Sequence, residues 1–304
     1  MAKIRLAPRT RLSWGYQDHH HPAFSPDGAR LAFVGGPAGK NAVYVMQMDR
    51  RTLRPVTASS ANHASPTFSP DGRFLYFGRQ PTVDDRWEIW VLDVDRPERS
   101  RRFLSSDEVG YSQPTLSPDG KQAAFTRRET NGRTRVHVGD VSRDHIGKVR
   151  PLADGGGLAD AHPAWSPDGA WIAFHRYEGA SGHTSQICKV RPDGRGLTPL
   201  TTSDDLDKHP AWASDEYLIY QSTDASGLRR LHIITSVGEP LGVLTSGETL
   251  DKHPAASVDR EGNVLVAYAS RIAGEPTGDT DHTFDVWAAP IESVRAQVKR
   301  KRTR

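Results

Sequence analysis

One pattern of eight residues returns along the chain and constrains the fold more than any other feature of the sequence. Its full copies end in Ser-Pro-Asp-Gly and occupy residues 21–28, 65–72, 113–120 and 162–169. Two shortened copies, 209–212 and 253–256, keep only the opening His-Pro-Ala. The first prolines of successive copies lie 44, 48, 49, 47 and 44 residues apart, which is the length of one four-stranded propeller blade.

Each repeat predicts four short strands. Ser-Pro-Asp-Gly predicts a tight turn after the first strand, because proline presets φ, aspartate bonds its own backbone and glycine accepts a positive φ. Alternating apolar segments follow, and in the first repeat they are 31–33, 43–46 and 53–56. Strands of this length and spacing are typical of a closed all-β ring.

The sixth repeat lacks a fourth strand, and the start of the chain supplies a candidate. The segment 10–13 precedes the first repeat as 56–59 precedes the second. We therefore predict an all-β fold, a single six-bladed β-propeller whose ring is closed by the N-terminal strand, with 9–13 paired beside 284–288. Residues 1–291 form this domain, and residues 292–304 form a basic C-terminal tail.

Composition narrows the function classes. The single cysteine, Cys188, excludes an internal disulfide, and no apolar run is long enough for a signal peptide or a membrane span. We therefore expect a cytoplasmic protein without membrane contact. The net charge of +3 is small, and no groove of interleaved basic and aromatic residues accompanies the basic tail, so nucleic-acid binding is not expected. No phosphate-binding glycine loop, zinc-type cysteine pair or nucleophile elbow is present.

The residue before the first proline of each repeat is the main candidate for chemistry, because the start of strand one lies nearest the channel of a propeller. We call these six positions the ring residues: His21, Ser65, Gln113, His162, His209 and His253. Ring closure would bring four imidazoles around one axis. Three carboxylates, Asp160, Asp207 and Asp251, lie two positions before three of them. Imidazole suits Mn, Zn, Fe, Ni or Cu, and a carboxylate behind the ring can orient it.

Two interpretations of the ring residues stay open. His-Pro can be a repeat consensus in which each imidazole bonds a neighbouring loop. The alternative is one divalent metal ion. The two shortened repeats favour the metal, since they lost Ser-Pro-Asp-Gly but kept histidine.

Two further sets share the predicted channel-mouth face. His19, His63 and Tyr111, two positions before ring residues, are candidate catalytic bases. Arg79, Arg127 and Arg176 lie at one equivalent position in three successive blades, where guanidinium groups could bind a carboxylate or phosphate or simply be surface charge. The loop 273–282 is a candidate lid.

The Ser-Pro-Asp-Gly units with their flanking aromatic residues resemble the TolB-like propeller repeat, a relative of WD repeats, over about residues 10–291. The last unit, 251–256 continuing to 285–290, also resembles the closing blade of oligogalacturonate lyase. That family is cytoplasmic and holds a divalent metal near the channel mouth through three histidines and a glutamine. The resemblance implies His162, His209 and His253 as ligands, with Gln113 or His21 completing the set.

These observations predict a metal-dependent enzyme, of the lyase type that removes a proton from a carbon acid, acting on a small anionic substrate at the channel mouth. The alternative is a non-catalytic propeller that binds a protein or peptide on the same face, because a fold alone does not decide function.

Overall fold

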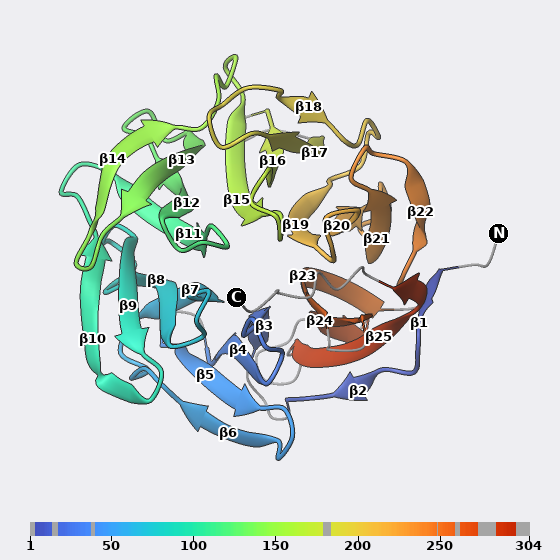
Figure 1. The fold of residues 1–304 in the computed structure, drawn as a ribbon, viewed down its shortest axis with the longest axis horizontal. Helices are drawn as coiled ribbons and strands as arrows, with labels where there is room; N and C mark the ends of the chain where they lie inside the picture. Colours follow the sequence, from blue (N-terminus) through green and yellow to red (C-terminus); the bar gives the residue numbers. More distant parts are fainter. Residues whose placement is uncertain are drawn as a thin grey trace, which may run out of the picture.

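The computed structural model describes residues 4–13, 18–37, 40–178, 184–247, 249–258, 262–272 and 284–295. Its strands form six antiparallel sheets arranged as blades around a central axis (Figure 1). This confirms the predicted all-β, six-bladed propeller. Among the described residues, no helix is long and apolar enough to cross a membrane.

Blades 1 to 3 each take four consecutive strands, and the first strand of each lies innermost (Figure 1). Their bounds are β3 (His19–Phe24), β4 (Arg30–Gly35), β5 (Ala42–Gln47), β6 (Thr52–Pro55), β7 (Asn62–Phe68), β8 (Phe74–Gln80), β9 (Glu88–Asp93), β10 (Arg96–Leu104), β11 (Gly110–Leu116), β12 (Gln122–Arg128), β13 (Thr134–Val141) and β14 (Ile146–Pro151).

Blades 4 and 5 repeat this plan, and blade 6 combines the two ends of the chain. The bounds are β15 (Ala159–Trp165), β16 (Ile172–Tyr177), β17 (Ser185–Val190), β18 (Thr198–Pro199), β19 (Lys208–Trp212), β20 (Tyr217–Thr223), β21 (Arg229–Thr235), β22 (Pro240–Val243), β23 (Thr249–Val258), β24 (Asn263–Ile272), β25 (Asp285–Arg295), β1 (Arg5–Leu6) and β2 (Thr10–Arg11).

The N-terminal segment closes the ring as predicted. β2 pairs antiparallel with β25, with Thr10 opposite Ala288 and Arg11 opposite Trp287, and β1 pairs with the same strand further along. Leu12 is buried in an apolar cluster shared by blades 1 and 6. β25 continues to Arg295, so the proposed boundary at residue 291 stays a prediction, and residues 296–304 lie outside the described part of the chain.

The core is divided among the contacts between neighbouring blades. The aromatic residues of the second strands, Phe33, Phe77, Phe125 and Phe174, are almost fully buried, each in a cluster with apolar residues of an adjacent blade. Because each blade buries its faces only against its neighbours, the ring depends on being closed.

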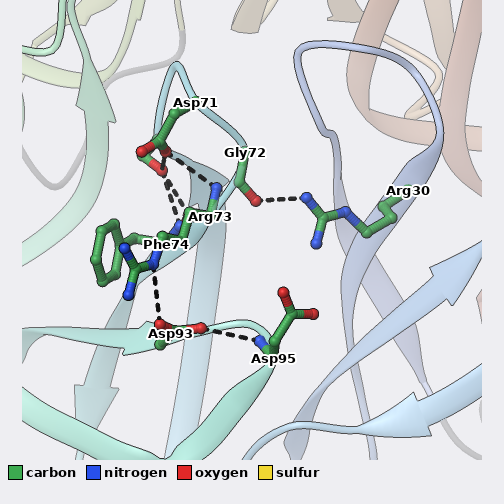
Figure 2. Close-up of polar contacts among 8 residues, drawn as sticks. Arg30, Asp71, Gly72, Arg73, Phe74, Asp93 and Asp95 are labelled. Atoms are coloured by element: carbon green, nitrogen blue, oxygen red, sulfur yellow. Dashed lines mark hydrogen bonds and ion pairs between the residues drawn. The ribbon is translucent and has the colours of Figure 1, made fainter.

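The Ser-Pro-Asp-Gly turns fix the end of each inner strand. In blade 2, the Ser69 hydroxyl donates to Asp71 at 2.5 Å, and the amide of Arg73 donates to the same carboxylate at 3.0 Å (Figure 2). Gly72 has a φ of 70° and its carbonyl accepts a hydrogen bond from Arg30 of blade 1 at 2.6 Å (Figure 2). We call this end of the propeller the turn face and the other end, where second strands lead to third strands, the histidine face.

Candidate metal and substrate site

The six ring residues share an unusual backbone conformation. Their φ angles lie between 48° and 55°, in the left-handed region that residues other than glycine rarely adopt. Each sits in a β-bulge; in blade 1, His20 is opposite Val34 but Ala23 is opposite Ala32, so two residues of β3 face one residue of β4. Ser65 and Gln113 adopt the same conformation, so the bulge itself does not require histidine.

The bulges bring the four ring histidines together on the axis. The ring centroids of His21 and His253 are 3.9 Å apart, those of His253 and His209 are 4.4 Å apart, and those of His209 and His162 are 4.0 Å apart. His162 and His21 complete the circuit at 6.4 Å. Four residues from four blades therefore form one contiguous imidazole cluster.

Two further histidines join this cluster, and the repeat pattern did not identify them. His175, on β16, lies 5.0 Å from His162 and 5.8 Å from His209 between ring centroids. His20, on β3, lies 5.9 Å from His253. Neither occupies a ring position. His175 directly follows Phe174, the aromatic residue of the second strand, and this adjacency is the sequence signal that could have identified it.

Burial keeps these imidazoles neutral. Desolvation lowers the pKa of His162 to about 3 and that of His20 to about 4. Desolvation, followed by the charges of neighbouring side chains, holds the pKa of His21, His209 and His253 well below the usual 6.5. Neutral imidazole is the form that binds metal.

The Nδ1 atoms of the cluster are buried and lack hydrogen-bond partners. Among the described residues, none donates to or accepts from Nδ1 of His20, His21, His162, His175, His209 or His253. A buried polar atom without a partner costs roughly 1–3 kcal/mol. Bonds to neighbouring loops, which the repeat-consensus interpretation requires, are therefore not made through these atoms.

Gln113 positions His162. Its Oε1 accepts hydrogen bonds from the Thr126 hydroxyl at 2.6 Å and from the His162 amide at 3.1 Å. Its Nε2 lies 2.8 Å from Nε2 of His162 and has protons to donate. Gln113 therefore belongs to the cluster through His162.

The arrangement has ligand chemistry suited to a metal but not yet its coordination geometry. Within the described part of the chain, no group of three or more His, Cys, Asp or Glu side chains is arranged to hold a metal ion. The rings of His21 and His253 stack, with planes 22° apart, instead of directing nitrogens to a common point. Coordination requires rotation of these side chains.

Two cavities adjoin the cluster. One, of about 150 Å³, lies on the axis and is lined by all six ring residues with the prolines that follow them. The other, of about 370 Å³, lies between blades 3, 4 and 5, and its walls include His162, His175, His209, Tyr177 and Lys208. The second cavity has room for a small molecule beside the imidazoles.

The three candidate bases lie against the aromatic residue of their own blade. His19 contacts Phe33 at 5.6 Å and its Nδ1 lies 3.8 Å from Asp285. The Nδ1–H of His63 donates to the Asn41 carbonyl at 2.9 Å, and the His63 ring contacts Phe77. Tyr111 contacts Phe125 at 5.7 Å. None of the three is among the residues that line the 370 Å³ cavity.

The three candidate arginines occupy equivalent positions, since each lies opposite the residue two positions before a ring residue. Each also has a partner in its own blade. Arg79 covers Trp90 at 4.6 Å, Arg127 lies 3.5 Å from Glu129, and Arg176 bonds both carboxylate oxygens of Asp160 at 2.7 and 3.1 Å.

The three carboxylates were predicted to orient the imidazoles. In the described part of the chain they accept hydrogen bonds from other side chains instead. Asp160 binds Arg176, as above, and Asp207 accepts from Ser222 at 2.6 Å and Ser203 at 3.1 Å. Asp251 accepts from Thr249 at 3.0 Å. These bonds anchor the blades. The predicted lid, 273–282, lies outside the described residues.

Comparison with known proteins adds a family. The model of the PD40 family, the TolB beta propeller domain, matches residues 9–215. The structure is similar to that of TolB from Acinetobacter baumannii, at 21% identity and a TM-score of 0.62, over 80% of this chain and 58% of that one. The chain thus spans less than two thirds of that TolB.

Two other structures match over almost their whole length. A protein of unknown function from Dyadobacter fermentans has 10% identity and a TM-score of 0.69, with 96% of this chain and 99% of that one covered. An oligogalacturonate lyase in complex with manganese has 14% identity and a TM-score of 0.57, with the same coverage of 96% and 99%. At these identities the likeness shows the fold.

Proposed function

This chain belongs to the TolB beta-propeller domain family, and within that family we propose that it is a metal-dependent enzyme acting on a small anionic substrate at the histidine face. One observation carries the proposal. Four neutral ring imidazoles from four blades meet on the axis, and their buried Nδ1 atoms have no partner among the described residues.

The donor set is chemically suited to a divalent transition metal. His162, His209 and His253 would hold the ion, with His21 or Gln113 as a further ligand. The likeness to a propeller lyase that binds manganese supports this choice of ion class. A bound ion would provide the electrophile that stabilises the enolate-like charge formed when a carbon acid loses its proton.

The protein itself supplies the binding space and the electrostatic environment. The 370 Å³ cavity admits a small molecule next to His162 and His209, and Lys208 brings a positive charge to its wall. The low local polarity that keeps the imidazoles neutral also strengthens the attraction between Lys208 and an anion. His19, His63 and Tyr111 remain the candidate bases from the sequence.

The test begins with protein purified without a His tag, because a tag would itself bind metal. After incubation with Mn²⁺ or Zn²⁺ and desalting, elemental analysis should find about one ion per chain. The loaded protein should then catalyse elimination on some member of a panel of small hydroxy or uronic acids, followed by the absorbance of the new conjugated double bond. Protein that retains no ion of either metal contradicts the proposal and favours the peptide-binding scaffold.

A further inference from the structure

Four positively charged side chains gather on the histidine face at the junction of blades 5 and 6, which are neighbours in the ring (Figure 1). Lys208 begins β19, and Arg229 begins β21 of the same blade. Lys252 and Arg271 lie on β23 and β24 of the next blade. We call these four residues the basic cluster.

Within each of the two blades, the two residues of the basic cluster lie close together. Lys208 is opposite Gln221 and Arg229 is opposite Thr223, only two residues further along β20. In blade 6, the Lys252 ammonium lies 3.6 Å and the Arg271 guanidinium carbon 5.0 Å from the centre of the Phe284 ring. Phe284 thus holds the two cations close together.

The two pairs face each other across the blade junction. β21 and β20 both contact β23. Burial and the positive charge of Arg271 lower the pKa of Arg229, which is the effect of two like charges held near each other. All four side chains are partly buried, so water screens their repulsion less than it would on an open surface.

The residues of the basic cluster have few acidic partners in the described part of the chain. Among the described residues, no ion pair or hydrogen bond is formed by the charged groups of Lys208, Arg229, Lys252 or Arg271 with an acid. The carboxylate of Asp18 is close enough for its charge to interact with that of Lys252. It also accepts a hydrogen bond from the Phe284 amide at 2.9 Å. The Nε atom of Arg271 is buried without a described partner.

We propose that the basic cluster is the anion-binding subsite of this propeller, and that it takes a small molecule carrying two or more negative charges as carboxylates or phosphates. Guanidinium and ammonium donors of this kind form charge-assisted hydrogen bonds with such groups. Lys208 connects the subsite to the imidazole cluster, since it lines the 370 Å³ cavity together with His162 and His209.

This assignment deepens the proposed function and rests on it for its catalytic meaning, but it changes the residues that bind the substrate. Arg176 already donates hydrogen bonds to both carboxylate oxygens of Asp160, and Arg127 already forms an ion pair with Glu129. The guanidinium groups of blades 5 and 6 have no such acid among the described residues. The anionic end is therefore held by blades 5 and 6 in place of blades 3 and 4.

The experiment measures anion binding to metal-free protein, so that it does not depend on the metal site. Protein stripped of metal and desalted is titrated at pH 7 and low salt with inorganic phosphate in one arm and malonate in the other. We expect a Kd of about 1 mM or tighter for at least one of them. Binding of phosphate alone, malonate alone or both supports the subsite and identifies its preferred group.

Variants connect the binding to these residues. Arg229→Gln and Arg271→Gln should each weaken binding about tenfold or more, because each removes a charge-assisted hydrogen bond. Arg229→Lys should retain part of the affinity. Arg195→Gln, which removes the same charge from a loop between third and fourth strands at the turn face, should leave binding unchanged. The proposal is overturned if neither anion binds at 10 mM, a concentration about tenfold above the expected Kd, or if both glutamine variants bind as the wild type does.

Discussion

The imidazole rings of His21 and His253 stack with their centroids 3.9 Å apart, although the two residues come from opposite ends of the chain. The contact lies where blade 6, which β1 and β2 complete, packs against blade 1. The histidine cluster is therefore a property of the closed ring, and opening the ring should separate its imidazoles.

Ring closure should be needed for stability. Deletion of residues 1–13 removes β1 and β2, which pair with β25, together with buried Leu12, and should lower the melting temperature by many degrees. The single variant Leu12→Ala should cost about 2–5 kcal/mol of the free energy of unfolding, as large-to-small changes in cores do. Arg5→Ala, at an exposed side chain of β1, is the matched control and should change little. Melting of the truncated protein within a degree or two of the full chain would show that the closure is dispensable.

The Ser-Pro-Asp-Gly turns should be structural only. Asp71→Ala removes acceptors used by the Ser69 hydroxyl and the Arg73 amide, so the free energy of unfolding should fall by about 1–2 kcal/mol (Figure 2). Because this turn lies on the turn face, metal stoichiometry should stay the same. A folded Asp71→Ala protein that had lost its metal would contradict the separation of the two faces.

Thr126 should affect the proposed metal site through its hydrogen bond to Gln113. Its hydroxyl donates to Gln113 Oε1 and lies 3.2 Å from the His162 amide, so Thr126→Val frees the glutamine while keeping the side-chain volume. Metal affinity should fall about tenfold or more, as changes behind a ligand typically cause. Thr57→Val, which also removes a hydroxyl bonded to a backbone amide, serves as the control in calorimetric titrations. Equal affinity in the two variants would show that Gln113 has no part in the site.

Acid should destabilise the metal-free protein through its buried histidines. Burial lowers the pKa of His63 to about 4, against about 6.5 in the unfolded chain. Between these values the unfolded state takes up a proton that the folded state does not, so the free energy of unfolding falls as pH decreases from 6.5 toward 4. The contribution of His63 is up to about 1.4 kcal/mol per pH unit.

Urea unfolding at several pH values measures this slope. The other buried histidines act in the same direction, so the wild-type slope should exceed that of one group. His63→Gln removes one titrating group and should make the slope shallower by about one proton, whatever its effect on stability at pH 7. An unchanged slope would mean that His63 titrates normally in the folded state.

The fold could be predicted from the sequence because its information is local and repeated. Each Ser-Pro-Asp-Gly turn marks the same point in its blade, and the missing strand of the sixth unit pointed to residues 10–13. The ring histidines followed from the same repeat. What the repeat could not predict are contacts between non-equivalent positions.

His175 and the basic cluster illustrate this limit. His175 reaches the axis from a second strand, and Arg229 and Arg271 approach each other from strands of two blades. The arginines of blades 2 to 4 were conspicuous because they repeat in sequence, yet Arg176 meets Asp160 across its own hairpin. Periodicity identifies equivalent positions, while pairing across a sheet decides which charges remain available.

Metal titration of the untagged protein tests the central claim most directly. The account predicts about one Mn²⁺ or Zn²⁺ ion bound per wild-type chain, loss of that ion in His209→Ala, and full retention in His63→Gln, a buried histidine that does not line the axial cavity. Both variants should remain folded by circular dichroism, because apolar contacts between neighbouring blades hold the ring together. Wild-type protein that binds no ion, or a folded His209→Ala protein that binds as tightly as the wild type, would contradict it.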